Sequence, residues 1–217
     1  MADAPADTQA PSPATPRVRV IVVNYNAGLH LARCLTALAA QTITDFEVIV
    51  VDNASTDDSL IDAVPDDPRF RVNRQSENTG FAAGNNIGAQ GCTAEWIATL
   101  NPDAFAAADW LERLLAAAAR HPGAAMFGST QIDAADPDRL DGSGDAYLAA
   151  GFAWRGNHGR TARDLPAEGT VFSPCAAAAL YRRTAFEAAD GFDESFFCYY
   201  EDVDLAFRLR LAGEYCV

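Results

Sequence analysis

Short runs of β-branched and other apolar residues alternate along this chain with stretches in which Leu and Ala recur at helical spacing. The apolar runs predict buried strands at 18–24, 46–51, 70–74, 95–100 and 124–129. The stretches between them predict helices at 28–40, from 78–80 to about 90 and at 110–120. Because right-handed crossovers join parallel strands, this alternation predicts an α/β fold, a Rossmann-like three-layer α/β/α sandwich around a mostly parallel sheet.

The alternation is lost at 131–170, a segment rich in Asp, Gly and Arg, where we expect a functional loop or a mobile lid. Regular structure is expected again as a strand-like segment at 170–182, a short helix at 185–189 and a last helix at 201–212. Gly213 is placed to end that last helix.

The start of the chain is rich in Ala, Pro, Asp and Thr, which predicts a disordered tail at 1–17 followed by one domain at 18–217. The last helix is followed by residues that look like the start of a new strand. We therefore expect that the domain is truncated and that some functional residues lie beyond residue 217.

The formal net charge of −14 argues against a protein that binds nucleic acid through a basic face. An anionic substrate would then need a metal ion or local Arg groups. The five Cys lack CxxC spacing and the three His are far apart, so no zinc site is predicted and reduced thiols in the cytoplasm are expected. No run approaches the roughly 18 apolar residues of a membrane span.

Polar residues follow three of the predicted strands. Asn24 and Asn26 come after the first strand, Asp52 and Asn53 after the second, and Asn101-Pro102-Asp103 after the fourth. Ligands of parallel sheets bind beyond the carboxyl ends of the strands, so we expect these side chains to meet at one edge. Neither a GxGxxG fingerprint nor a P-loop follows the first strand, so no glycine cradle is expected for a nucleotide.

Each of these groups has both a structural and a functional interpretation. Asn24 and Asn26 suit a polar turn or contacts with a base or ribose. Asp52 suits contact with a pyrimidine N3–H or a ribose hydroxyl, or, with the 53–58 cluster, the cap of a short helix. Asp103 suits an ordinary turn, or a divalent cation whose coordination shell is completed by diphosphate oxygens and water.

The segment 78–88 contains Gly and Ala at close helical spacing, together with Asn78, Gly80 and Asn85. Small residues allow a helix to pack closely on a sheet, and a helix N-terminus favours a phosphate. We expect both roles.

Acidic residues at 201–204 begin the last predicted helix, directly after the aromatic run 196–200. The helix dipole favours acids at this position whatever the function. Neighbouring aromatic rings also raise a carboxyl pKa towards that of a useful general base. We expect Asp103 and Asp202 to face each other across one cleft wide enough for a diphosphate and a sugar ring.

Taken in order, five segments resemble the family 2 glycosyltransferases, and among them the bacterial rhamnosyltransferase-like members. These segments are VIVVNYNAG (20–28), VVDNASTDDS (50–59), NTGFAAGNNIG (78–88), LNPDA (100–104) and GFDESFFCYYEDVDLAFRLRLAG (191–213). The match covers 17–217. It implies the GT-A fold and transfer of a sugar from a nucleotide-diphosphate donor in cell-envelope polysaccharide synthesis.

The resemblance also implies roles for individual residues. Asp202 matches the catalytic base, with Glu201 beside it. Asp103 matches the last acid of the family's metal motif, which implies Mg²⁺ or Mn²⁺, although Asn101 replaces the first acid and weakens the site. The nucleotide would be bound by residues at the strand ends and at the start of the small-residue helix: Asn24, Asn26, Asp52, Asn53, Asn78, Gly80, Asn85 and Asn101.

The expected partners are a dTDP-rhamnose-like or UDP-sugar donor and a saccharide or lipid-linked acceptor, with no nucleic acid. The expected location is the cytoplasm, with peripheral association at the inner face of the membrane. A non-catalytic nucleotide-binding module and a sugar nucleotidyltransferase are the alternatives, although the second usually carries a Gly-rich basic loop after the first strand, and none is present.

Overall fold

The computed structural model describes residues 15–163, 165 and 167–217. Most of the predicted tail at 1–17 lies outside these residues. Within them, no helix combines the length and the apolar character that crossing a bilayer requires.

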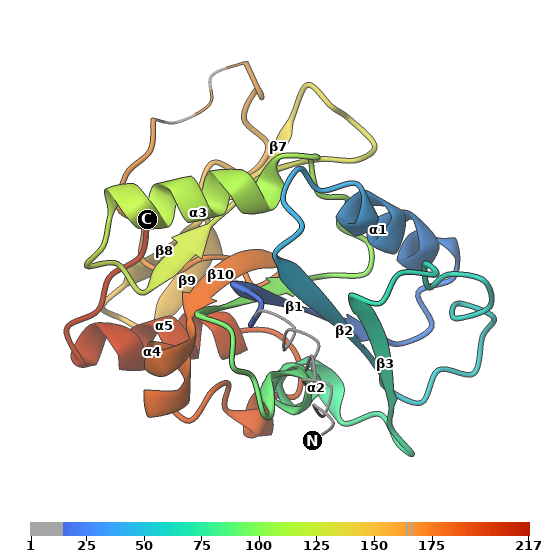
Figure 1. Ribbon diagram of the computed structural model, residues 1–217. Coiled ribbons are helices and arrows are strands. Elements are labelled where there is room, and N and C mark those ends of the chain that lie inside the picture. The colour runs from blue at the N-terminus through green and yellow to red at the C-terminus, as the bar shows by residue number, and fades with distance from the viewer. Residues whose placement is uncertain (1–14, 164, 166) are drawn as a thin grey trace, which may run out of the picture.

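A six-stranded sheet forms the centre of the molecule, in the order β3-β2-β1-β4-β10-β5 (Figure 1). The strands are β1 (Val18–Asn24), β2 (Phe46–Asp52), β3 (Phe70–Arg74), β4 (Trp96–Leu100), β5 (Met126–Gly128) and β10 (Ala178–Arg182). The first four pair in parallel, whereas β10 is antiparallel to both β4 and β5. The expected mostly parallel sheet is confirmed, with β10 inserted against the common direction.

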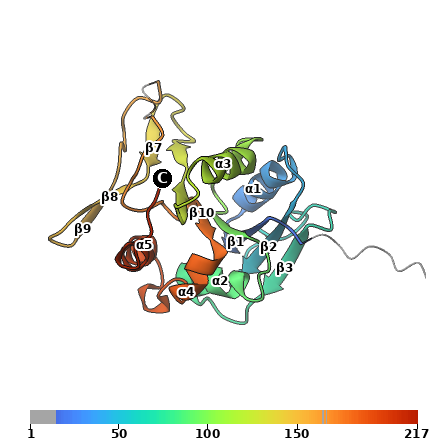
Figure 2. The same ribbon diagram turned by 60° about the vertical axis from the view of Figure 1, so that its left-hand side comes forward.

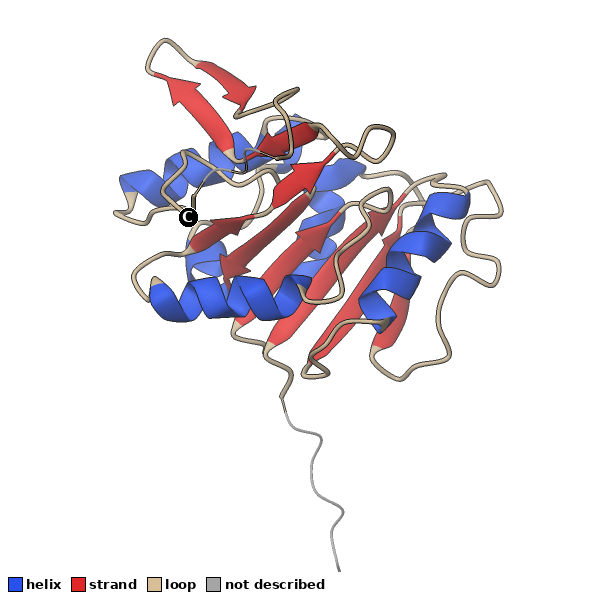
Figure 3. Ribbon diagram, turned by 90° about the horizontal axis from the view of Figure 1, so that it is seen from above, coloured by secondary structure: helices blue, strands red, loops and turns tan. Residues whose placement is uncertain are grey.

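Helices cover both faces of the sheet (Figure 3). One face is covered by α1 (Leu29–Ala39) and α3 (Trp110–Arg120), and the other by α2 (Gly80–Ala89), α4 (Arg183–Ala188) and α5 (Glu201–Leu211). A short 3₁₀ turn, η1 (Glu194–Phe196), precedes α5. The three-layer α/β/α arrangement predicted from the sequence is therefore confirmed.

The central strand β1 is apolar at nearly every position because it packs against a core on each face of the sheet. Val18, Val20 and Val22 pack into the core shared with α1 and α3, whereas Ile21 and Val23 pack into the core shared with α2, α4 and α5. Successive strand residues point to opposite faces, so a strand covered on both sides must be apolar on both.

The prediction of a short helix after β2 is wrong, because 53–58 is an irregular loop with bends and 59–63 forms turns. The Asn26 side chain explains the difference. Its Oδ1 accepts hydrogen bonds from the backbone N–H groups of Thr56 (2.8 Å) and Asp57 (3.2 Å), which fixes this segment as a loop.

The segment 131–170 is more regular than expected. It contains two antiparallel pairs, β6 (Thr130–Ile132) with β7 (Leu140–Ser143) and β8 (Asp145–Leu148) with β9 (Phe152–Arg155). Strands of three or four residues are too short to show a clear period of two. Figure 2 shows the β8–β9 hairpin extending away from the central sheet.

The helix α2 approaches β1 closely through two glycines. A Cβ added at Gly84 would lie 2.8 Å from Val23 Cγ1, and one added at Gly88 would overlap the Ile21 side chain. Both contacts would be shorter than ordinary van der Waals contact, so α2 can pack at this depth only without side chains at these positions.

We predict that Gly88→Ala destabilises the protein by about 1–3 kcal/mol, because overpacking against β-branched Ile21 outweighs the higher helix propensity of Ala. Urea unfolding measures this. Gly123→Ala is the control, since its Cβ would meet Tyr215 at an ordinary 3.5 Å. In a double-mutant cycle, Gly88→Ala should cost less in the Ile21→Ala background than in the wild type, whereas an unchanged or higher stability of Gly88→Ala alone would contradict this packing.

Candidate active site

The parallel register brings the polar residues after β1 and β2 together. Asn24 is directly paired with Asp52, and both are buried. The Asn24 amide nitrogen lies 3.0 Å from each of Asp52 Oδ1, Ser55 Oγ and Ser59 Oγ, and its two N–H groups are shared among these three acceptors. Arg74 Nη1 lies 3.7 Å from Asp52 Oδ2 at the exposed side of this group. The expected convergence at one sheet edge is thus seen for the side chains that follow β1 and β2, whereas no hydrogen bond joins Asn101 or Asp103 to this group in the described residues.

Asn53 connects the end of β2 to the start of α2. Its Oδ1 accepts from the backbone N–H and the hydroxyl of Thr79, and its Nδ2 donates to the Gly80 carbonyl at 2.9 Å. Both ends of the amide are therefore engaged within the protein, as is Asn26 Oδ1. The structural interpretation of these two residues is well supported, and their contact with a nucleotide stays a prediction.

The start of α2 is fixed against the chain that precedes α5. Asn78 Oδ1 accepts from the Gly80 N–H at 3.0 Å, and Gly80 has a φ of +87°. A Cβ at Gly80 would lie 2.5 Å from the Phe197 carbonyl oxygen. Asn85 is buried further along α2 and donates to the Phe81 carbonyl within the helix. These residues position α2, and their contact with a nucleotide also stays a prediction.

A chain of hydrogen bonds links the end of β4 to the acidic start of α5. The Asn101 N–H donates to the Ala177 carbonyl at 2.9 Å, and the buried Thr99 hydroxyl donates to the Ala176 carbonyl at 2.7 Å. The Ala176 N–H in turn donates to Asp202 Oδ2 at 2.9 Å. Residues about a hundred positions apart in the sequence are thereby held at one site.

This site is an open pocket of about 290 Å³. The lining residues come from α2, the residue after β4, β8, β9, the segment before β10, and the start of α5 with the residues before it: Phe81, Asn101, Asp145, Ala153, Trp154, Arg155, Cys175, Ala177, Cys198, Tyr199, Tyr200, Glu201, Asp202 and Val203. Asn101 and Asp202 thus share one pocket. Asp103 lies two residues beyond Asn101, is exposed to solvent, and does not itself line the pocket, so the residue that faces Asp202 across the pocket is Asn101 and not, as expected, Asp103.

Three carboxyl groups line this pocket, and burial raises the pKa of each. The pKa of Glu201 is raised to about 7, first by burial and then by the charge of Asp202. The pKa of Asp145 is raised to about 6 by burial and by Asp202, against the opposing effect of Arg155. Burial also raises the pKa of Asp202, although the N–H groups of Ala176 and Val203 stabilise its charged form.

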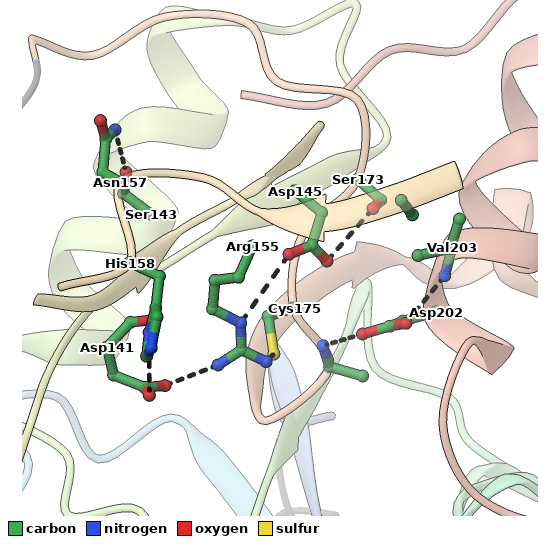
Figure 4. A network of polar contacts seen from close by, with 12 residues as sticks. Asp141, Ser143, Asp145, Arg155, Asn157, His158, Ser173, Cys175, Asp202 and Val203 are labelled. Atoms are coloured by element: carbon green, nitrogen blue, oxygen red, sulfur yellow. Dashed lines mark hydrogen bonds and ion pairs between the residues drawn. The ribbon is translucent and has the colours of Figure 1, made fainter. Parts of the chain in front are cut away.

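Arg155 brings positive charge to the pocket (Figure 4). Its guanidinium lies between two carboxylates, with Nη1 2.6 Å from Asp141 Oδ2 and Nε 3.8 Å from Asp145 Oδ1, and Nη2 lies 2.6 Å from Cys175 Sγ. Sequence reasoning missed Arg155 and Asp145, because both lie in the segment whose sequence shows no regular period. The Asp-Gly-Ser-Gly-Asp sequence at 141–145 was the one available signal.

The residues before α5 have an unusual backbone. Phe197, Tyr199 and Tyr200 have φ values of +56°, +72° and +69°, a region that bulky side chains rarely adopt. Such conformations cost free energy and persist where the surrounding structure enforces them, often at functional sites. Here they place aromatic rings at the mouth of the pocket and Glu201 at the start of the helix.

The 101–103 segment offers oxygen ligands for a divalent cation. Asn101 Oδ1 is buried without a hydrogen-bond partner in the described part of the chain, and the Asp103 carboxylate is exposed nearby. Among the residues that the structure describes, no three His, Cys, Asp or Glu side chains form a metal-binding group. A hard cation at this segment would therefore have to obtain most of its ligands from a bound diphosphate and water.

Several glycosyltransferases are similar to this chain in sequence. It is 32% identical to the N-acetylglucosaminyl-diphospho-decaprenol L-rhamnosyltransferase of Mycobacterium tuberculosis, over 89% of this chain and 70% of that protein. It is 34% identical to the putative glycosyltransferase EpsH of Bacillus subtilis, over 46% of this chain and 30% of that protein.

Solved structures with the same fold include S. aureus TarS (TM-score 0.66, 18% identity) and a mannosyltransferase of Pyrobaculum calidifontis in complex with GDP-Man and Mn²⁺ (TM-score 0.66, 20% identity). They are matched over 93% and 96% of this chain, which spans 35% and 56% of those chains. This similarity confirms the GT-A fold.

The sequence model of the family described as "Glycosyl transferase family 2" matches residues 19–189, which is most of the chain. With the M. tuberculosis relative and the shared GT-A fold, this match establishes that the chain belongs to glycosyl transferase family 2.

Proposed function

We propose that this protein transfers a sugar, with inversion, from a nucleotide-diphosphate donor to a hydroxyl of a saccharide or lipid-linked acceptor. The observation that carries the proposal is the pocket shared by Asp202 and Asn101, joined through the backbone of Ala176 and Ala177. A dTDP-rhamnose-like or UDP-sugar is the proposed donor. The name of the M. tuberculosis relative, a rhamnosyltransferase acting on a diphospho-decaprenol, supports this choice of donor and acceptor.

Asp202 is the proposed general base. Its two oxygens each accept one backbone N–H, from Ala176 and Val203, which fixes the carboxylate while each oxygen keeps a further lone pair for an acceptor hydroxyl. A base so held takes the acceptor proton as the oxygen attacks the anomeric carbon opposite the leaving diphosphate.

Glu201 has a different proposed role. With a pKa of about 7 it is largely protonated below neutral pH, and its Oε2 has no hydrogen-bond partner among the described residues. A neutral Glu201 allows Asp202 to keep its negative charge, because two adjacent buried carboxylates do not readily ionise together. We therefore assign Glu201 to tuning the pKa of Asp202.

The donor diphosphate brings negative charge to an acidic pocket. Arg155 already lies among Asp141, Asp145 and Cys175, so it offsets charges that belong to the protein. When bound, Mg²⁺ or Mn²⁺ would supply Lewis-acid neutralisation of the leaving group. Asp103 and Asn101 are the proposed protein ligands. Asn24, Asn26, Asp52 and Asn53, with the start of α2, are proposed to form the edge on which the nucleotide lies.

We predict that Asp202→Asn lowers kcat by roughly 10²–10⁴-fold, because the amide cannot accept the proton. The affinity for UDP or dTDP, measured by calorimetry, should stay within a few-fold of the wild type. Asp204→Asn is the matched control: this residue lies on the same helix and pairs with Arg208 at 2.8 Å. Full activity of Asp202→Asn would show that another group is the base.

Removal of divalent cations should abolish transfer and weaken donor binding, and Mn²⁺ or Mg²⁺ should restore both. Asp103→Asn should raise the Mn²⁺ concentration needed for half-maximal activity at least about tenfold, since one of few protein ligands is lost. Asp109→Asn, at an exposed carboxylate paired with Arg113, is the control. Undiminished transfer in EDTA would contradict a metal-dependent mechanism.

The raised pKa of Glu201 should make the free energy of unfolding depend on pH. Folding raises its pKa from an ordinary 4.5 to about 7, so its contribution to stability is complete below pH 4.5 and is lost as pH rises through 7. Glu201→Gln should therefore be more stable than the wild type at pH 8, by about 1–3 kcal/mol, with a flatter profile between pH 5 and 8. Urea titrations at each pH measure this, with exposed Glu187→Gln as control. If the free energy of unfolding changed with pH in the same way for Glu201→Gln and the wild type, the raised pKa would not belong to Glu201.

A further inference from the structure

The turn of the β8–β9 hairpin is apolar throughout. Residues 148–154 read Leu-Ala-Ala-Gly-Phe-Ala-Trp, without one charged side chain, in a chain in which 21% of residues are charged. Three large side chains of this hairpin tip (148–154) are exposed: Leu148 by 52%, Phe152 by 67% and Trp154 by 54%. An apolar patch of this kind on a projecting element marks an interaction site.

Cross-strand pairing explains which side of the hairpin is exposed. Leu148 pairs with Phe152, and Ala146 pairs with Trp154, so these side chains share one face. The opposite face carries Tyr147, whose ring stacks on Phe172 with centroids 4.5 Å apart. The inner face thus anchors the hairpin to the body of the protein, whereas the outer face points its large side chains into solvent.

The exposed apolar side chains follow a definite sequence from the turn of the hairpin towards the body of the protein. Leu148 and Phe152 flank the turn, whereas Trp154, on the same face, lies further back. Tyr200, whose hydroxyl donates to the Ala153 carbonyl at 3.4 Å, adds a further ring beside them. A wholly apolar tip followed by Trp and Tyr rings is the order that a membrane–water interface favours, because these rings are apolar with a polar atom at one edge.

The patch is continuous with the candidate active site. Ala153 and Trp154 line its pocket, together with Tyr199 and Tyr200, whose rings are largely exposed. Figure 2 shows the hairpin extending from the body of the protein, so its turn lies away from the central sheet. Any surface that the tip enters would therefore lie beside the pocket mouth.

We propose that the hairpin tip inserts into the outer region of a lipid bilayer and holds the active-site pocket at the membrane surface. This inference rests on the proposed function, because a lipid-linked acceptor presents its sugar at that surface. The tip carries no charge and the chain has a net charge of −14, so the attraction is apolar and does not require anionic lipid. Insertion of the tip brings the acceptor hydroxyl to the side of the pocket that contains Asp202.

The test uses the full chain and phosphatidylcholine vesicles without any acceptor or donor. Co-flotation reports binding, and tryptophan emission reports insertion. Trp96 and Trp110 are only 3% and 8% exposed, so a blue shift on adding vesicles arises from Trp154. We expect co-flotation that persists in about 0.5 M NaCl, accompanied by the blue shift.

Leu148→Ser/Phe152→Ser should weaken vesicle binding at least about tenfold and remove the blue shift. Leu29→Ser/Ile61→Ser removes two comparably exposed apolar side chains elsewhere and should bind as the wild type does. Thermal melts of both variants show whether the fold is kept. Phe152→Ser alone is a second, milder variant, because one substitution disturbs the hairpin less than two. It should lose an intermediate part of the vesicle binding.

Three results would overturn the proposal: no binding of the wild type to vesicles, equal binding of the hairpin and control variants, or release by salt. Concentration-dependent dimerisation lost only in the hairpin variant, without vesicle binding, would assign the tip to a second copy of the chain. Failure of the proposed function is recognised separately, because hydrolysis of a sugar nucleotide in the absence of vesicles reports on the donor site alone.

Discussion

The antiparallel pairing of β10 with β4 is the constraint on which the site depends. β4 ends at Leu100, directly opposite Ala178, the first residue of β10. The residues just before β10 therefore lie beside Asn101 at the edge of the sheet where ligands bind. From there the Ala176 N–H reaches Asp202, while the Thr99 hydroxyl fixes the Ala176 carbonyl. A parallel strand in this position would begin at the opposite edge and would leave α5 without this anchor.

The electrostatics of the site follow from that geometry. α5 begins at the pocket wall, where Glu201 is buried and Asp202 is partly buried, so both carboxyl groups are shielded from water although the helix N-terminus favours negative charge. Asp145 reaches the same pocket from β8, and Arg155 from β9 offsets part of the accumulated charge. Raised carboxyl pKa values and the left-handed backbone at 197–200 both reduce stability at neutral pH. Proteins accept such local costs at sites that must bind charge or transfer protons.

The fold could be predicted from the sequence because its central strands are buried on both faces. In β1 every residue from Val18 to Val23 except Arg19 is apolar, and even Arg19 is nearly buried and pairs with Glu47 at 2.8 Å. Such runs are recognisable without knowledge of their partners. The direction of β10 was not predictable in this way, since its apolar run looks the same in a parallel or an antiparallel setting.

The site was predictable only in part, for a similar reason. Asn24, Asp52, Asn101 and Asp202 are found by where they fall relative to strand and helix ends. Asn53 and Asn26 have the same polarity and position, yet their amides hold the loop and the start of α2 together. Asp145 and Arg155 acquire their roles through the pairing of two four-residue strands, and neither hydrophobic period nor spacing indicates that pairing.

The most direct measurement is a crystal structure of the protein with a non-hydrolysable sugar nucleotide and Mn²⁺. The account predicts the diphosphate and cation beside Asn101 and Asp103, and the sugar in the pocket with its anomeric carbon open to attack from the side of Asp202. A donor bound instead at a second hollow, which is lined by residues of β8 and by Arg210, with Asp202 remote from the anomeric carbon, would contradict it.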